Sequence, residues 1–148
     1  MQGNENCSYS GDILVVDDAV ANLKILVSLL DDAGYRVRAA TSGKAALMIC
    51  EKRPPDLVLL DVMMPEMDGY EVCSHLQARE KSRNIPVIFI SAMDNSNEKL
   101  KCFDVGGVDF ITKPFYAQEV LARVKTQVRL VMLQRELQQL RRECDQRR

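Results

Sequence analysis

Three carboxylates and one ammonium group each follow a short apolar run in this chain of 148 residues, at Asp17, Asp18, Asp61 and Lys113. A hydroxyl, Ser91, ends another apolar run. Carboxylates are hard oxygen ligands that suit Mg²⁺ or Mn²⁺, and lysine and serine side chains can bind the oxygens of a phosphoryl group. Phosphoryl chemistry is therefore one interpretation. The other interpretation is that these residues merely cap helices and end strands. The positions of the predicted strands and helices distinguish the two.

Apolar runs and helical patterns alternate five times along the chain. Strands are expected at 13–16, 37–40, 57–60, 86–91 and 109–114. Helices are expected at 19–32, 42–53, 70–80, from the loop 94–97 to 105, and at 117–144. Strict alternation with short turns predicts parallel strands, right-handed crossovers and helices on both faces. The third strand is apolar throughout, which is typical of a central strand buried on both faces. We therefore expect a doubly wound five-stranded parallel sheet of order 2-1-3-4-5, a flavodoxin-like α/β fold.

This fold would bring the candidate residues together, because the carboxyl ends of parallel strands lie at one edge of the sheet. Asp17 and Asp18 would then lie beside Asp61, where their mutual repulsion requires a cation. Without histidine or cysteine nearby, Mg²⁺ is the expected ion, with Mn²⁺ possible. Lys113 would reach the same rim. A carboxylate that attacks phosphorus needs the charge on the phosphoryl oxygens offset, and Asp61 on the central strand is the expected nucleophile.

At this point the motifs resemble those of a known family, the receiver domain of bacterial two-component response regulators. The residues that carry the resemblance are Asp17-Asp18, Asp61 with Met63-Met64-Pro65 and Asp68-Gly69, Ser91-Ala92, and Lys113-Pro114-Phe115. The resemblance covers about residues 12–128. It implies a signalling domain that catalyses its own phosphorylation and slowly loses the phosphoryl group, and that is not otherwise an enzyme. The donor would be a cognate histidine kinase.

The resemblance also implies roles for individual residues. Asp61 is the phosphoacceptor, and it binds Mg²⁺ together with Asp17, Asp18 and the backbone carbonyl of Met63. The phosphoryl group is bound by Ser91, Ala92 and Lys113. The Lys113–Pro114 peptide bond is expected to be cis, as in the family.

Three further side chains bear on switching and on the lifetime of the phosphorylated state. In the family a hydroxyl moves toward the phosphoryl group while an aromatic residue turns inward, and Ser91 and Phe110 match these positions. Phe110 has no hydroxyl, so the switch is expected to depend on packing, unless Phe110 is a plain core residue. Met63 and Met93 would shield the acyl phosphate from water, which predicts slow autodephosphorylation, unless they merely cover the pocket.

In the C-terminal part of the sequence, leucines recur at alternating spacings of three and four residues, at Leu130, Leu133, Leu137 and Leu140. Cys144 follows four residues after the last of them and continues the pattern. This spacing favours a parallel coiled coil that pairs two receivers as a homodimer, with Glu136 opposite Arg141 and Glu143 opposite Arg148 of the partner chain. A frayed amphipathic helix is the alternative. The expected organisation is a disordered lead at 1–11, a receiver domain at 12–128 and a helical extension or linker at 129–148.

Composition excludes several classes of partner. A net charge of −1 draws the chain neither to nucleic acid nor to an anionic membrane, so we expect it to bind neither directly. The sequence has no apolar run long enough to span a membrane and no apolar secretory segment near residue 1, which predicts a cytoplasmic protein. The five cysteines form no C-x-x-C pair and are expected to be reduced thiols.

Three other functions compete with phosphoryl acceptance. A phosphohydrolase with an aspartate nucleophile would need a second aspartate two residues later, where this chain has Met63. A flavin- or nucleotide-binding module would need glycines or hydroxyls in the first loop, where Asp17 and Asp18 stand. A dimerising receiver-like scaffold that is not phosphorylated would not need the full set of acidic, hydroxyl and lysine positions. The cognate kinase, and the output domain or partner, are not specified by the sequence.

Overall fold

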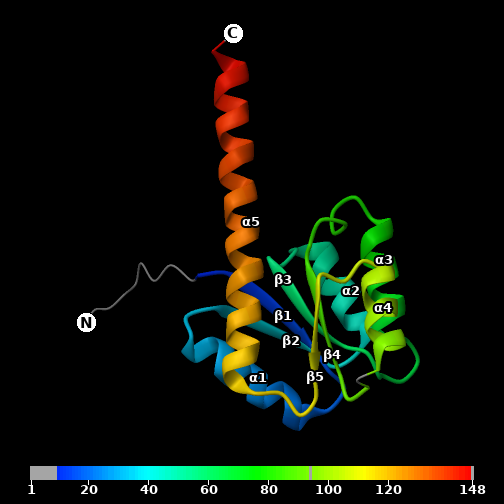
Figure 1. Cartoon of the computed structure of the whole chain (residues 1–148). Helices are drawn as coiled ribbons and strands as arrows, with labels where there is room; N and C mark the ends of the chain where they lie inside the picture. The colour runs from blue at the N-terminus through cyan, green and yellow to red at the C-terminus, as the bar shows by residue number, and fades with distance from the viewer. Residues whose placement is uncertain (1–9, 94, 148) are drawn as a thin grey trace.

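The computed structural model describes residues 10–93 and 95–147. Most of the expected lead-in, as well as Arg148, lies outside the described residues. Ten elements alternate along the chain, and the five strands form one parallel sheet of order β2-β1-β3-β4-β5, which confirms the predicted fold (Figure 1). The strands are β1 (Asp12–Val16), β2 (Arg36–Ala40), β3 (Leu57–Asp61), β4 (Val87–Ser91) and β5 (Asp109–Thr112).

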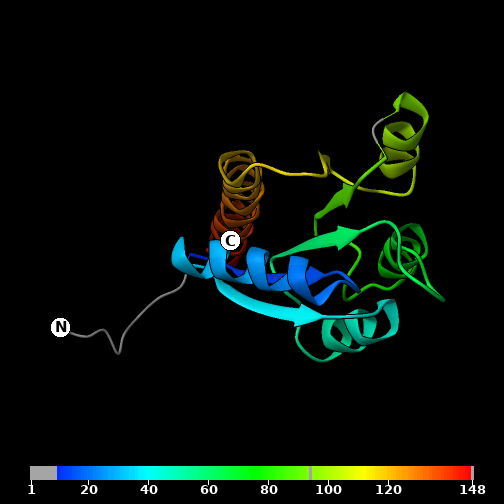
Figure 2. The same cartoon turned by 90° about the horizontal axis from the view of Figure 1, so that it is seen from below.

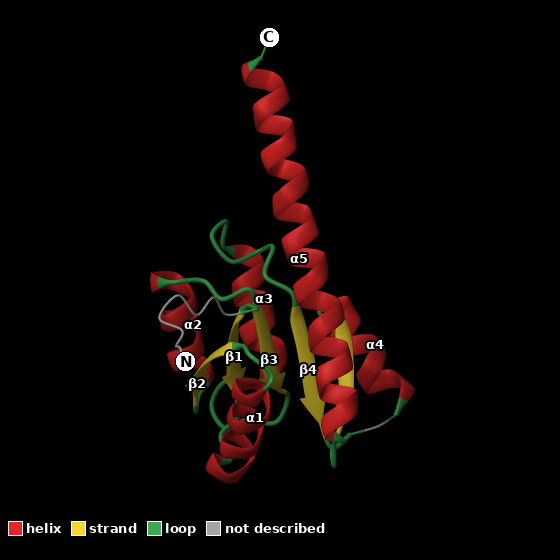
Figure 3. Cartoon of the chain, turned by 90° about the vertical axis from the view of Figure 1, so that its left-hand side faces the viewer, coloured by secondary structure: helices red, strands yellow, loops and turns green. Residues whose placement is uncertain are grey.

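Helices cover both faces of this sheet, as Figures 2 and 3 show. They are α1 (Val20–Asp32), α2 (Gly43–Lys52), α3 (Gly69–Ala78), α4 (Ser96–Asp104) and α5 (Ala117–Gln146). One core, beneath α1 and α5, contains Leu59, Leu26 and Val124, and the other, beneath α2, α3 and α4, contains Leu60 and Leu76. Successive residues of β3 enter opposite cores because side chains alternate along a strand. The central strand is thus buried at every position.

Helix ends differ slightly from the expected ranges, for local reasons. The sequence predicts the third helix at 70–80, but α3 begins at Gly69 because Asp68 and Glu71 form a capping box, and it ends at Ala78. The Ser82 hydroxyl donates a hydrogen bond to the Leu76 carbonyl (2.8 Å) and closes that end. The fifth strand is also shorter than predicted, since β5 ends at Thr112, so that Lys113 and Pro114 begin the next loop.

The capping box also decides the alternative interpretation of Asp61. The helix that follows β3 is capped by Asp68, whose side chain accepts a hydrogen bond from the Glu71 amide (2.9 Å). Asp61 is the last residue of β3 and lies seven positions before the cap, so it does not cap this helix. A buried carboxylate without a capping role is costly unless it has other partners.

Helix α5 extends well beyond the sheet (Figure 1). Val120, Val124 and Val128 are buried against β-strands and α1, whereas the four predicted seam leucines each expose about half of their surface. Contact with the rest of the chain continues past Val128, because the Arg135 guanidinium pairs with the Asp56 carboxylate at the start of β3. Within the described residues, no helix combines the length and apolarity that crossing a membrane would require.

Candidate functional site

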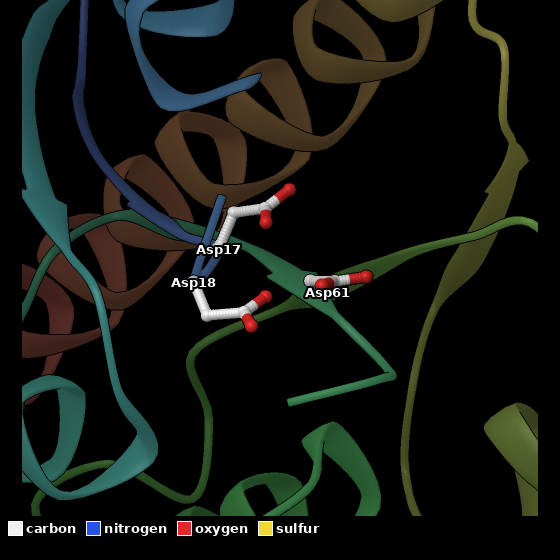
Figure 4. A group of neighbouring side chains, drawn as sticks. All are labelled: Asp17, Asp18 and Asp61. Carbon is white, nitrogen blue, oxygen red and sulfur yellow. The ribbon is translucent and has the colours of Figure 1, made fainter. Parts of the chain in front are cut away.

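The carboxyl ends of β1 and β3 bring three aspartates together (Figure 4). Asp17 and Asp18 follow β1, and Asp61 ends β3. One carboxylate oxygen from each lies within 4.8 Å of the other two. Asp17 and Asp61 are almost completely buried, while Asp18 is exposed at the rim. The convergence expected from strand order is therefore present.

Local hydrogen bonds hold these aspartates in place. The Asp17 amide donates to the Ala40 carbonyl of β2 (3.2 Å), and its carboxylate accepts from the Ala19 amide (2.9 Å), which turns the chain out of β1 and into α1. After Asp61, the Val62 amide still donates to Ile90 of β4 (3.1 Å), so the sheet ladder supports the acidic residue from behind. Both buried carboxylates therefore stand on regular, rigid backbone.

Lys113 reaches this pocket from the end of β5. Its Nζ lies 3.2 Å from Asp61 Oδ1 and 3.3 Å from Asp17 Oδ2, close enough to donate a hydrogen bond to each. Its backbone amide donates to the Ser91 carbonyl (2.8 Å), which ties the start of the loop to β4. The following Lys113–Pro114 peptide bond is cis, as expected from the sequence.

Charge and burial act together on these groups. Burial and the neighbouring Asp17 raise the pKa of Asp61 from 3.8 to about 6, although Lys113 opposes this shift and Asp18 adds to it. Burial would by itself lower the pKa of Lys113, but the carboxylates of Asp61 and Asp17 outweigh it and raise that pKa above its usual value. One ammonium does not compensate three clustered carboxylates, and two negative charges remain when all are ionised.

The donor set fits a divalent magnesium ion. Three carboxylates offer hard oxygen atoms within a small radius, and the surplus of two negative charges equals the charge of the ion. No described cysteine or histidine belongs to the acidic cluster, which disfavours zinc or copper. Whether the Met63 carbonyl also contributes stays a prediction.

The other predicted site residues surround the pocket without joining the charged cluster. Ser91 is buried, and its hydroxyl oxygen accepts from the Met93 amide (3.1 Å). Ala92 is exposed beside it. Met63 exposes 57% of its surface and Met93 37%, so both side chains lie at the surface.

Phe110 occupies an inward position. It is 7% exposed and packs in the core beneath α2, α3 and α4, with the Lys99 ammonium 5.9 Å from its ring centroid. Phe110 has no hydroxyl group, but Tyr70 of α3 has one in the same core. Its hydroxyl donates a 2.5 Å hydrogen bond to Glu98 of α4. The sequence pattern places Tyr70 only at the start of a helix, and the signal for its inward ring is its position next to the buried Val72 and Cys73.

Gly69 has a structural role that its place in a predicted turn does not indicate. A Cβ atom at this position would lie 2.5 Å from the Asp61 carbonyl oxygen, so only glycine permits α3 to start this close to the end of β3. The Gly69 amide donates to the Val62 carbonyl (2.8 Å) and closes the loop. Glu66, in the same loop, has φ 70°, a left-handed conformation uncommon outside glycine and asparagine. A glycine at the first position of a helix, where propensity disfavours it, was the available signal.

Fold and site together define a response regulator receiver. The family described as the response regulator receiver domain matches residues 13–125, and the chain belongs to this family. It is therefore a receiver domain of two-component signalling systems.

Individual relatives agree with this assignment. The chain is 40% identical over 130 residues to the response regulator PleD of Caulobacter vibrioides, a match that covers 88% of this chain and 29% of PleD. Chemotaxis protein CheY4 of Vibrio cholerae is similar in structure, with a TM-score of 0.75, 27% identity and coverage of 78% of this chain and 96% of that chain. NtrX from Brucella abortus has a TM-score of 0.80 and 30% identity, over 88% of this chain and 29% of that chain.

Replacing Asp61 with Asn should stabilise the metal-free protein near neutral pH. Since the pKa of Asp61 is raised from 3.8 in the unfolded chain to about 6 in the fold, the ionised carboxylate destabilises the native state increasingly as pH rises through that interval. We expect Asp61→Asn to raise the free energy of unfolding by about 1–3 kcal/mol near pH 7 in a chelator, and to change it little below about pH 4.

Urea unfolding at the two pH values measures this difference. The control is Glu80→Gln, at an exposed position in the turn after α3, for which we expect no gain in stability at either pH. A gain for Asp61→Asn that is the same at both pH values would contradict the electrostatic explanation.

Proposed function

We propose that Asp61 accepts a phosphoryl group from a histidine kinase and that the resulting acyl phosphate switches the receiver. The observation that carries this proposal is the position of Lys113, with its Nζ 3.2 Å from Asp61 and 3.3 Å from Asp17. A structural ion pair would need one carboxylate. Here the single ammonium of Lys113 lies between the buried carboxylates of Asp17 and Asp61, and the third carboxylate, Asp18, stands at the rim. The surplus negative charge suits this pocket to a metal cation, which together with Lys113 would receive a phosphoryl group.

The proposed step is an in-line displacement. A carboxylate oxygen of Asp61 forms a bond to phosphorus, and the bond between phosphorus and the donor nitrogen of the kinase histidine breaks, so that the imidazole leaves with the electron pair. The Lys113 ammonium stays close to the new phosphoryl oxygens and offsets part of their charge. The Ser91 hydroxyl, whose oxygen accepts from the Met93 amide, would be free to donate its proton to another phosphoryl oxygen.

Asp17, Asp18, Asp61 and the Met63 backbone carbonyl would hold the Mg²⁺ ion, which supplies further charge neutralisation on the phosphoryl group. Two of these carboxylates are buried and held by backbone hydrogen bonds, so they remain positioned without the ion. The switch would couple Ser91 to Phe110, whose inward ring contacts the core near α4. The state change rests on packing, because Phe110 carries no hydroxyl.

Acetyl phosphate with Mg²⁺ should add one phosphoryl group to the protein. We expect intact-mass spectrometry to show the adduct in the natural sequence, and to show none with Asp61→Asn or after removal of divalent ions by a chelator. The control is Asp56→Asn, at the residue just before β3 and so at the opposite end of that strand from Asp61. Release of phosphate without a stable adduct would instead indicate a phosphohydrolase, and the absence of both would indicate a scaffold that is not phosphorylated.

The adduct should be long-lived because the residues beside it are apolar. Met63 and Met93 offer no group that could orient an attacking water molecule, so we expect Met63→Asn or Met93→Glu to shorten the half-life of the phosphoryl group several-fold. The control is Ile25→Asn, which introduces the same polarity at an exposed position on α1. Unchanged half-lives in both methionine variants would show that these side chains only cover the pocket.

We also propose that the extension of α5 forms a parallel coiled coil between two receivers. Successive residues of a helix are about 100° apart, so Leu133 lies half a turn away from Val124, which faces the sheet. Leu130, Leu137 and Leu140 share the outward face and are about half exposed. One face of α5 therefore packs on its own receiver, and the opposite face is left for a second helix. This supports the division into a domain at 12–128 and a helical extension at 129–148.

Cys144 provides a test of this arrangement. It continues the leucine stripe, and in a parallel, in-register pair the two Cys144 side chains would lie opposite each other within disulfide reach. Cys50, Cys73 and Cys102 are buried, so in a Cys7→Ser background Cys144 is the accessible described thiol. We expect copper phenanthroline to yield a covalent dimer that disappears with Cys144→Ser and with Leu133→Glu. A monomer in sedimentation and no cross-link would contradict the coiled coil, and a dimer without cross-link would contradict its parallel register.

A further inference from the structure

A groove on the opposite side of the molecule from α5 is unrelated to the acidic pocket. It has a volume of about 1000 Å³ and lies between α2 and the chain that leaves α3. Helices α2 and α3 pack against each other there, as Figure 2 shows. None of the candidate phosphorylation residues lines it.

The floor of the groove is apolar. It is formed by Leu47 and Met48 of α2 and by Met67 of the loop before α3. Leu47 is anchored in the core, while Met48 exposes 54% of its surface although it is a large apolar side chain. Methionine side chains are flexible and polarizable, and they recur on surfaces that accept apolar side chains of partners. The floor therefore has the chemistry of a docking surface.

The rim of the groove carries an excess of positive charge. Glu51 is already paired with the Arg79 guanidinium (3.4 Å), and the Lys81 ammonium donates to the Glu51 backbone carbonyl (2.9 Å) rather than to a carboxylate. Lys44 and Lys52 form no ion pair with any residue the structure describes. With Glu80 as the other carboxylate of the lining, the rim keeps a net charge of +2 on a chain whose total is −1.

The spacing of the two lysines suits a helix. Lys44 and Lys52 are eight residues apart on α2, which corresponds to about 12 Å along the helix axis. Met48 lies midway between them on the same side, because four residues make slightly more than one helical turn. A helix laid along α2 would thus meet an apolar residue in the middle and a cation near each end.

We propose that this groove binds an amphipathic helix of a partner protein, with apolar residues on the floor and carboxylates facing Lys44 and Lys52. Among the helices that the structure describes, a second copy of this chain offers none that is both apolar on one face and acidic on the other. The exposed leucines of α5 are accompanied between residues 134 and 147 by four arginines and three carboxylates, and the exposed Leu100 and Phe103 of α4 by two lysines and two carboxylates. The proposed occupant is therefore an acidic amphipathic helix of a partner protein.

The test uses two short synthetic amphipathic helices with the same leucine face, one with glutamate and one with lysine on the polar face. Each is titrated into the ¹⁵N-labelled full chain. We expect the acidic helix alone to bind, with shifts confined to residues 44–52, to Met67 and to residues 79–81. Lys44→Glu with Lys52→Glu should weaken binding about tenfold or more. Met48→Gln, at an exposed position, should weaken it as well without unfolding α2.

The matched control is Lys24→Glu with Lys125→Glu, which changes the net charge equally at exposed positions on α1 and α5. It should bind the acidic helix like the natural sequence. Equal binding of the lysine helix, equal weakening in both charge-reversed variants, shifts centred elsewhere, or no binding of the acidic helix would each overturn the proposal. Binding of phosphatidylglycerol vesicles that Lys44→Glu with Lys52→Glu abolishes, without binding of the acidic helix, would assign the groove to a membrane surface instead.

Discussion

The structure depends on one balance of charge, the contact of the Lys113 ammonium with the buried carboxylates of Asp17 and Asp61. Parallel strand order forces the ends of β1 and β3 together, and with them two carboxylates that repel each other. A single cation from β5 makes this tolerable without neutralising the pocket. The native fold therefore keeps a site that is short of positive charge, and this shortage, more than any one residue, makes the pocket receptive to a metal ion.

The sequence carried enough information to predict the fold and the charged centre. Apolar runs at regular intervals identified every strand, and the uniform burial of β3 followed from its composition. Asp17, Asp61 and Lys113 could be placed together because strand order brings the ends of parallel strands to one edge. These predictions succeeded because they depend on periodicity and topology, which are encoded locally.

Features that depend on atomic packing could not be predicted in the same way. The close approach of Gly69 to the Asp61 carbonyl depends on the path of a loop, whereas the sequence indicates only a turn at this position. The hydrogen bond from Tyr70 to Glu98 joins two helices whose relative position is decided by the whole core. The pairing of Arg135 with Asp56 likewise depends on the direction in which α5 leaves the sheet, which no local pattern specifies.

The contact between Arg135 and Asp56 lies at the opposite end of β3 from the acidic pocket. Asp56 precedes β3 and Asp61 ends it, so the anchor of α5 and the acidic pocket are about 16 Å apart along a strand that is buried on both faces. A strand packed on both sides cannot stretch or bend independently of its neighbours. Under the proposed function, phosphorylation at one edge of the sheet would not contact a partner that α5 engages at the other edge. Its effect would reach that partner as a displacement of helices or as a change in which surfaces associate.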